Sequence, residues 1–256
     1  MKTNMKKQYH IGIDDSHGAK IALLPGDPGR VETVARQLDN PRFYAQNREY
    51  TTWLGELPGG ETVVVMSTGM GGPSAAICVE ELVQTGVRDL IRVGTCGGMD
   101  LDVAGGDVVI ATGAVRMEGT TREYVPIEFP AVAHLDVTNA LVTAAREQGS
   151  PFHAGIVQCK DSFYGQHDPA RMPVGCHLEN QWRAWCKARC LASEMESAAL
   201  FIVCQVLGVR SGCVLSVVWN QERQKAGLSN PECHDPGRAV AVAVRAAEIL
   251  ADAKRI

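Results

Sequence analysis

The chain has 256 residues, of which 45% are hydrophobic and 21% charged, as in an ordinary globular protein, and at this length we expect one α/β domain over residues 1–256. A formal net charge of -4 argues against nucleic acid or an anionic membrane as the main partner, although a few arginines could still bind a small anion. Nine cysteines at irregular spacing do not resemble a disulfide framework, so we expect reduced thiols and a cytoplasmic location.

In chain order, Met1 to His10 is polar and contains lysines, which predicts neither a secretory leader nor a membrane anchor. Short runs rich in β-branched residues then alternate with helical patterns, which is typical of a mostly parallel sheet with helices on its faces. Asp27 and Pro28 indicate a helix start, with Asp27 as the N-cap. We expect strands at residues 20–24, 51–57, 61–68, 90–93, 107–112, 152–159 and 212–218. Further helices are expected at residues 73–86, 135–148, 178–188, 194–207 and 237–253.

Glycine-rich segments follow three of these strands, at residues 25–30, 69–72 and 94–98. Ligands of open α/β sheets bind at the carboxyl ends of the strands. We therefore expect these segments to be turns in which the backbone comes close to a ligand.

Two arginines accompany the glycine-rich segments. Arg30 falls in the first turn of its helix, where the macrodipole disfavours a cation, so an anion bound at that helix start would explain it. A solvated surface arginine is the alternative. Arg92 interrupts an apolar strand, where an unpaired guanidinium would be costly to bury. Its place before Gly94 and Thr95 fits a phosphate site, because the planar guanidinium makes paired hydrogen bonds to phosphate, and a structural salt bridge is the alternative.

Two further segments carry polar groups suited to a nucleoside. Ser193 to Glu196 has the Ser-x-x-Glu pattern of a helix capping box. The Glu196 carboxylate could instead accept hydrogen bonds from the two vicinal hydroxyls of a ribose. At residues 163–167, Gln166 could pair with the carbonyl and N–H edge of a base while Phe163 stacks on its face, and a turn with a buried phenylalanine is the alternative.

Taken together, the motifs resemble those of the nucleoside phosphorylase family, the hexameric purine and uridine phosphorylases, from about His10 to Leu250. The motifs are GDPGR at 26–30, REYTTW at 48–53, STGMGGPS at 67–74, RVGTCGG at 92–98, FYGQ at 163–166 and SEMES at 193–197. The resemblance implies a three-layer α/β/α fold with a central twisted mixed sheet. It also implies a pentosyltransferase that uses inorganic phosphate to split a nucleoside into a free base and ribose 1-phosphate, and it disfavours a nucleoside-binding protein without turnover.

The same resemblance implies roles for single residues. Phosphate would be held by Gly26, Arg30, Arg92 and Thr95, together with Arg48 of a neighbouring subunit. The ribose would lie on Met195 and Glu196, with His10 of the neighbouring subunit near its 5-hydroxyl. Phe163 and Gln166 would contact the base. The catalytic residues would be Arg92, Thr95, Gln166 and Glu196, with no cofactor and no covalent intermediate.

Enzymes of this family are dimers assembled into hexamers, so each site is expected to borrow residues across a dimer interface. Some members also hold a monovalent cation, K⁺, between subunits. Glu49, Met70 and Ser74 occupy the matching places here.

Within the family, the sequence favours uridine or deoxyuridine as substrate, with purine or broad specificity as the alternative. Purine-cleaving members carry an aspartate after the late strand that protonates the leaving base, and this chain has Asn220 there. Hydrolytic relatives lack the paired phosphate arginines, whereas this chain has Arg30 and Arg92.

The uracil-binding arginine that is usual in the family is missing, because Asp168 stands in its place. We expect Arg223 or Lys160 to supply the missing positive charge, with Arg171 as the third choice. The polar segment 221–230 is expected to form a mobile lid over the base.

Overall fold

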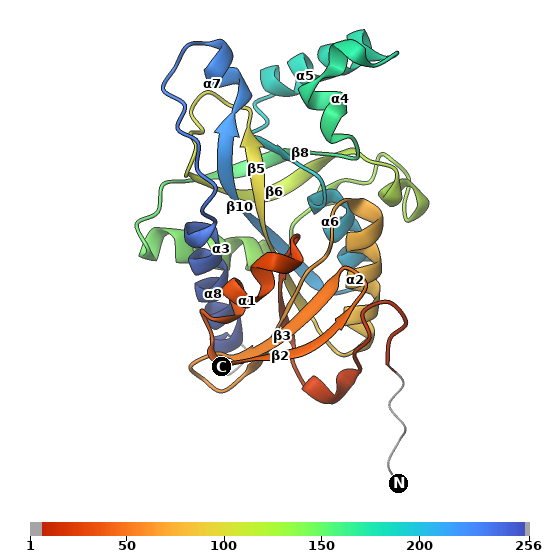
Figure 1. Ribbon diagram of the computed structural model, residues 1–256, viewed down its shortest axis with the longest axis vertical. Helices are drawn as coiled ribbons and strands as arrows, with labels where there is room; N and C mark the ends of the chain where they lie inside the picture. Colours follow the sequence, from red (N-terminus) through yellow and green to blue (C-terminus); the bar gives the residue numbers. More distant parts are fainter. Residues whose placement is uncertain (1–6, 254–256) are drawn as a thin grey trace.

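The computed structural model describes residues 7–253, so the first six residues of the amino-terminal segment considered above lie outside it (Figure 1). Within that range, no helix combines the length and the apolar character needed to cross a membrane. Asp27 is the N-cap of the helical segment that begins at Pro28, as predicted, and its side chain accepts a hydrogen bond from the amide of Gly29 at 2.8 Å.

Ten strands form one sheet. They are β1 (Ile21–Pro25), β2 (Asp39–Asn47), β3 (Tyr50–Glu56), β4 (Thr62–Met66), β5 (Asp89–Gly98), β6 (Val108–Met117), β7 (Ala131–Val132), β8 (Phe152–Lys160), β9 (Ala192–Glu194) and β10 (Arg210–Asn220). Their order is β10-β6-β8-β9-β5-β1-β4-β3-β2, with β7 paired to β6. Because β10 also pairs with β5, the strands β5, β10, β6, β8 and β9 close into a ring.

Parallel and antiparallel neighbours are equally frequent in this sheet. β1 is parallel to β4 and β5, whereas β3 is antiparallel to both of its neighbours, β2 and β4. The sheet is therefore mixed, as the family resemblance implied, and the expectation of a mostly parallel sheet was wrong. The β2–β3 and β3–β4 hairpins account for part of the difference, because antiparallel neighbours need only short connections. The pairs β5–β9 and β6–β10 add antiparallel neighbours that lie far apart in the sequence.

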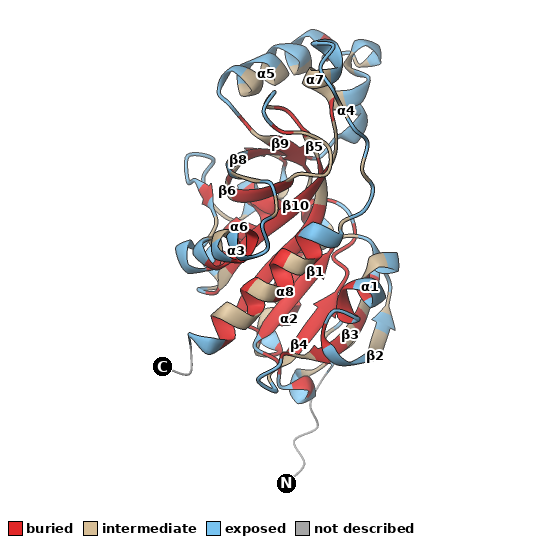
Figure 2. Ribbon diagram, turned by 90° about the vertical axis from the view of Figure 1, so that its left-hand side faces the viewer, coloured by how far each residue is buried: buried red, intermediate tan, exposed pale blue. Residues whose placement is uncertain are grey.

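Helices cover both faces of the sheet and produce three layers (Figure 1). On one face α2 (Gly72–Gln84) packs against α6 (Ser197–Val206), and on the other α3 (Leu135–Glu147) packs against α8 (Gly237–Asp252) beside α1 (Val31–Ala35). One apolar cluster lies under each helical layer, as the buried stripe along α8 shows (Figure 2). The remaining helical segments are η1 (Asp15–His17), η2 (Pro28–Arg30), η3 (Thr120–Glu123), α4 (Phe163–His167), η4 (Pro169–Arg171), α5 (Gly175–Lys187) and α7 (Gln221–Lys225).

All the predicted strands and helices are present, and the differences lie at their ends and between them. β2 escaped prediction because it is an edge strand whose residues are mostly exposed and include Pro41, so it has no buried alternation. β9 has only three residues. The segment 163–167, expected as a turn, forms the short helix α4.

The third glycine-rich segment is not a turn, because β5 continues through it to Gly98. Its glycines make room for side chains instead. A Cβ on Gly94 would lie 2.9 Å from the Arg92 Nη2 atom, and one on Gly98 would lie 2.7 Å from the side-chain amide of Asn220. The first two glycine-rich segments do follow strands β1 and β4 as predicted.

Beyond the carboxyl ends of β5 and β10, helices α4, α5 and α7 gather at one end of the molecule (Figures 1 and 2). The β2–β3 hairpin lies at the opposite end (Figure 1). This separation decides which of the predicted site residues can meet within one chain.

Candidate active site

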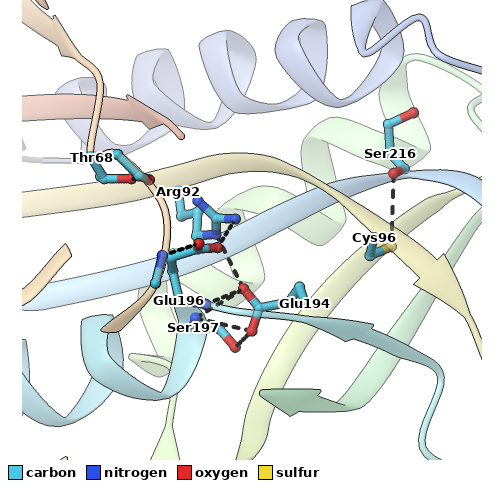
Figure 3. Close-up of polar contacts among 9 residues, drawn as sticks. Thr68, Arg92, Cys96, Glu194, Glu196, Ser197 and Ser216 are labelled. Atoms are coloured by element: carbon cyan, nitrogen blue, oxygen red, sulfur yellow. Dashed lines mark hydrogen bonds and ion pairs between the residues drawn. The ribbon is translucent and has the colours of Figure 1, made fainter. Parts of the chain in front are cut away.

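The centre of the candidate site is the buried guanidinium of Arg92 on β5, which lies between two carboxylates (Figure 3). Its Nε atom is 3.3 Å from a carboxylate oxygen of Glu194, and its Nη2 atom donates to Glu196. The salt bridge considered as the alternative to phosphate binding is thus present. Burial lowers the pKa of Arg92, but Glu196 and Glu194 outweigh burial and raise it, so the guanidinium stays charged.

The third nitrogen of Arg92, Nη1, is buried and has no hydrogen-bond partner in the described part of the chain. It lies against the turn after β1, because a Cβ on Gly26 would come within 3.6 Å of it and within 3.4 Å of the Gly69 carbonyl. A buried N–H group without a partner is costly and rare in folded proteins. The salt bridge therefore uses only part of the guanidinium and leaves one charged donor directed at a glycine turn.

The helix start after β9 differs from the predicted capping box. α6 begins at Ser197, and the Glu194 carboxylate caps it by accepting from the amides of Glu196 and Ser197 at 2.9 and 3.0 Å. Ser193 lies one strand residue earlier and caps nothing, so the predicted box was wrong. The motif does not form a capping box because residues 192–194 pair as strand β9, so the helix begins after them.

Because Glu194 caps the helix, the Glu196 carboxylate is released for other contacts. It accepts a hydrogen bond from the amide of Gly71 at 2.6 Å as well as from Arg92. Burial raises the pKa of Glu196, and the positive charge of Arg92 opposes that rise. One carboxylate oxygen thus faces the glycine-rich start of α2 and the other the guanidinium, and Met195 lies half-buried beside them.

Arg30 and Thr95 belong to the same two segments of the chain as Gly26 and Arg92. Arg30 lies in η2, and its side chain is about one-third exposed. Its Nε atom is 3.9 Å from Asp27, at the limit of an ion pair, so no strong partner holds it among residues 7–253. Thr95 is half-buried three residues beyond Arg92 on β5.

A cavity of about 600 Å³ opens beyond this centre, between α4, α5 and α7. Its polar lining includes Gln158, Lys160 and Gln166, and its apolar lining includes Trp182 and Trp185 of α5. A cavity of this size with mostly apolar walls and a few converging polar groups is typical of a small-molecule site.

The three cations considered for base binding lie in different places. Lys160 lines the cavity and donates a hydrogen bond to Ser193. Arg223 donates to the carbonyls of Leu101 and Ser229. Arg171 is 2.9 Å from Asp168 on the exposed surface. Of the three, the geometry brings only Lys160 to Gln166.

Phe163 stands at the edge of this region with half of its surface exposed. Its ring lies 4.3 Å from that of His167 and 5.4 Å from that of Tyr164. The buried phenylalanine considered as an alternative is therefore not present, and the ring is exposed on the surface of α4.

Two predicted residues, His10 and Arg48, lie by the β2–β3 hairpin. Asn47 donates from its side chain to the His10 carbonyl at 2.8 Å, and the His10 Nδ1 atom is 2.6 Å from a Glu81 carboxylate oxygen. Arg48 is exposed and lies over the ring of Tyr9 at 5.5 Å.

Glu49, Met70 and Ser74 meet at the start of α2. The Ser74 hydroxyl donates to a Glu49 carboxylate oxygen at 3.0 Å and lies 2.5 Å from the Thr68 carbonyl. Met70 is 85% exposed beside them. This arrangement gathers carboxylate, hydroxyl and carbonyl oxygens near the surface of the chain.

Sequence reasoning missed four contributors to the site: the capping role of Glu194, the amide of Gly71, and the side chains of Ser193 and Gln158. A signal existed for Glu194, because a second buried carboxylate two residues from Glu196 could have been expected beside Arg92. No local pattern predicts a role for Gln158, which is a polar residue inside an apolar strand.

Comparison with known proteins gives a consistent result. Residues 20–253 match the family described as the phosphorylase superfamily. The uridine phosphorylase of Treponema pallidum (strain Nichols) is 51% identical over 244 residues, covering 95% of this chain and 94% of the relative. That of Escherichia coli (strain K12) is 40% identical over 247 residues, covering 94% and 97%. A guanosine phosphorylase of Halorubrum lacusprofundi is 38% identical over 216 residues, covering 84% and 85%.

The ion pairs at the centre predict a pH-dependent stability. Arg92→Met should lower the free energy of unfolding at neutral pH by about 3–5 kcal/mol, because it leaves two buried carboxylates without their cation. Without Arg92, the folded-state pKa of Glu196 rises further above its unfolded value, so the folded state binds more protons and stability falls as pH rises above the ordinary glutamate range.

Urea unfolding of the wild type and of Arg92→Met at pH 5 and pH 7.5 measures this effect. We expect the deficit of the variant to be smaller at pH 5. An equal deficit at both pH values would contradict the ion-pair account.

Proposed function

The chain belongs to the phosphorylase superfamily, and from that premise we propose that it cleaves uridine with inorganic phosphate to uracil and ribose 1-phosphate. The relatives named uridine phosphorylase, at 40–51% identity over nearly the whole chain, support this choice of substrate. The observation that carries the proposal is the unpartnered Nη1 atom of Arg92 beside Gly26.

Phosphate fits this position for electrostatic reasons. The open donor of Arg92 is charged, so an anion would satisfy it more strongly than water could. Arg30 lies in the same glycine-rich segment, and within the described part of the chain its ion-pair partner is Asp27 at 3.9 Å. Gly26 offers its backbone without a side chain in the way, and Thr95 offers a hydroxyl on β5. We propose that these four groups hold phosphate.

The ribose would then lie next to the phosphate, on Met195 and Glu196. The Glu196 carboxylate already accepts two hydrogen bonds, from Gly71 and Arg92, and two vicinal hydroxyls could replace or share these contacts. A carboxylate offers about four lone-pair positions, so both arrangements can be accommodated.

The reaction needs no covalent intermediate. Phosphate attacks the anomeric carbon as the bond from that carbon to the base breaks, the sugar becomes oxocarbenium-like, and uracil leaves as an anion that takes a proton from solvent. The residues accelerate this step by positioning phosphate behind the sugar and by hydrogen bonds to the leaving uracil, which we assign to Gln166. Phe163 on α4 is assigned to the face of the base.

The environment of Asn220 favours a pyrimidine over a purine. Its side-chain nitrogen donates to the carbonyls of Asp100 and Val103, both at 2.8 Å, and its oxygen accepts from the amides of Glu222 and Arg223. An amide cannot protonate a leaving purine, and this one already has all its hydrogen-bonding groups engaged. The guanosine phosphorylase among the relatives keeps a purine substrate as the second candidate.

We further propose a hexamer built from dimers, in which Arg48 and His10 complete the site of the neighbouring subunit. Both residues lie near the β2–β3 hairpin, away from the end that carries α4, α5 and α7 (Figure 1). The exposed guanidinium of Arg48 would bind the phosphate in the site of the neighbouring subunit.

Glu49, Met70 and Ser74 at the same surface fit a monovalent cation such as K⁺, because hard cations prefer oxygen ligands and the Glu49 and Ser74 oxygens lie 3.0 Å apart. Such an ion would neutralise charge between subunits. The nine free thiols support a reducing, cytoplasmic location.

Arg30 offers the cleanest test of the phosphate site. Arg30→Ala should raise the KM for phosphate roughly 10- to 100-fold, the value of one charge-assisted hydrogen bond, with the KM for uridine little changed. Because Arg30 is partly exposed, the unfolding free energy should change by less than about 0.5 kcal/mol. Uracil release at varied phosphate gives the constants.

Arg36→Ala is the matched control, since Arg36 is exposed close by in the chain and pairs with Glu32. Wild-type kinetics are expected for it. Equal behaviour of Arg30→Ala and Arg36→Ala would remove Arg30 from the site.

Sharing of sites predicts complementation. Arg48→Ala and Glu196→Ala should each be nearly inactive. Arg48→Ala removes a group from the site of the neighbouring subunit, and Glu196→Ala removes a group from the site of its own subunit. After subunit exchange, an equal mixture should recover roughly a quarter of wild-type activity, from mixed dimers that contain one intact site. Exchange demonstrated by mass, with no recovery of activity, would indicate that each subunit holds a complete site.

A further inference from the structure

Three polar side chains converge on the hydroxyl of Ser193 at the wall of the cavity. Lys160 donates to the Ser193 Oγ atom, the Gln158 Oε1 atom lies 2.5 Å from it, and the Gln166 Oε1 atom lies 2.7 Å from it. The Gln166 Nε2 atom lies 3.4 Å from the Gln221 Oε1 atom. Ser193, Gln158 and Lys160 are all buried. The phosphate and ribose contacts described above use none of these three residues.

The proton inventory of this cluster restricts how Gln166 can be oriented. An ammonium group has three donors and no acceptor, so the Ser193 oxygen accepts from Lys160. The hydroxyl has a single proton to give, and two amide groups lie within reach of it. Only one of these amides can present its carbonyl oxygen to Ser193, and the other must present its nitrogen.

Gln158 is the amide that presents oxygen. Its nitrogen lies 3.1 Å from the Met117 sulfur, which can only accept, so reversing Gln158 would place its carbonyl oxygen against that sulfur. Ser193 therefore donates to Gln158. Ser193 then accepts from the Gln166 nitrogen, because oxygen and nitrogen of an amide are distinguished only by such networks. This assignment exchanges the Gln166 Oε1 and Nε2 atoms, so the Gln166 oxygen faces the Gln221 side-chain amide, which is reversed with it and donates to it.

Lys160 keeps the cluster in this state. Burial lowers its pKa, whereas Glu194 and Glu196 oppose that change, and no other charged side chain donates to Ser193 in the described residues. With the base bound at Gln166 as proposed, the Lys160 ammonium also lies near the leaving base, which acquires negative charge. It could thus replace the positive charge of the usual arginine, whose position in this chain is occupied by Asp168.

We infer that Ser193, held by Lys160 and Gln158, fixes the Gln166 amide with its carbonyl oxygen toward the base and thereby makes the site select a base with a ring N–H beside a carbonyl. Uracil and thymine have that edge. Cytosine has an unprotonated ring nitrogen there and would meet the amide oxygen lone pair. The three residues are positioning residues, and the inference rests on the proposed uridine cleavage.

Ser193→Ala tests it through specificity. Loss of the anchor lets the Gln166 amide reverse, so the KM for uridine should rise about tenfold, and the preference for uridine over cytidine in kcat/KM should fall by about the same factor. The KM for phosphate should not change, because Ser193 does not contact the phosphate groups. Ser193→Thr keeps a hydroxyl and should retain most of the preference.

Ser211 is another buried serine, on the distant part of β10, and Ser211→Ala is the matched control. It should leave the KM for uridine and the preference for uridine over cytidine unchanged. If Ser193→Ala does not fold, Lys160→Met is measured instead, because it removes the donor that fixes Ser193. The KM for uridine and the preference for uridine over cytidine are again the two readouts.

The inference is overturned if a folded Ser193→Ala or Lys160→Met keeps the wild-type uridine KM and the wild-type preference over cytidine. Failure of the proposed function looks different, because the wild type itself would then release no uracil from uridine in the presence of phosphate.

Discussion

The structure depends on a buried guanidinium that its own protein satisfies only in part. Arg92 gives two of its nitrogens to Glu194 and Glu196 and leaves the third against Gly26. Full pairing would make a structural salt bridge of the kind often replaceable by apolar residues. Partial pairing keeps the charge in place and directs one donor at a ligand, and the glycine-rich segments then follow as a requirement for space beside it.

The buried charges of the candidate site form a balanced set of two cations, Arg92 and Lys160, and two carboxylates, Glu194 and Glu196. Each carboxylate has a separate duty, since Glu194 caps α6 and Glu196 faces the start of α2. We propose that each cation likewise serves a different anion of the reaction, the entering phosphate for Arg92 and the departing uracil for Lys160. The chemistry is therefore divided along β5, β8 and β9, whose side chains hold these charges on rigid strands.

Sequence reasoning predicted the elements that have a buried, regular pattern and the glycine turns after β1 and β4. It placed Arg92, Glu196 and Gln166 at the centre, yet it gave the helix cap to Ser193, because a local motif cannot show that residues 192–194 pair as a strand. The Ser193 cluster was invisible for the same reason, since Gln158 and Gln166 come to it from other elements. Contacts within a helix turn can be read locally, whereas contacts across strands depend on the register that only the fold sets.

The central claim is that the open donor of Arg92 holds inorganic phosphate as a reactant. The most direct measurement is the release of uracil from uridine by the purified protein, with and without inorganic phosphate, while ribose 1-phosphate is quantified in the same reaction. The account predicts uracil and ribose 1-phosphate in equal amounts when phosphate is present and almost no cleavage when it is absent. Equal release of uracil in phosphate-free buffer, with free ribose as the second product, would contradict it.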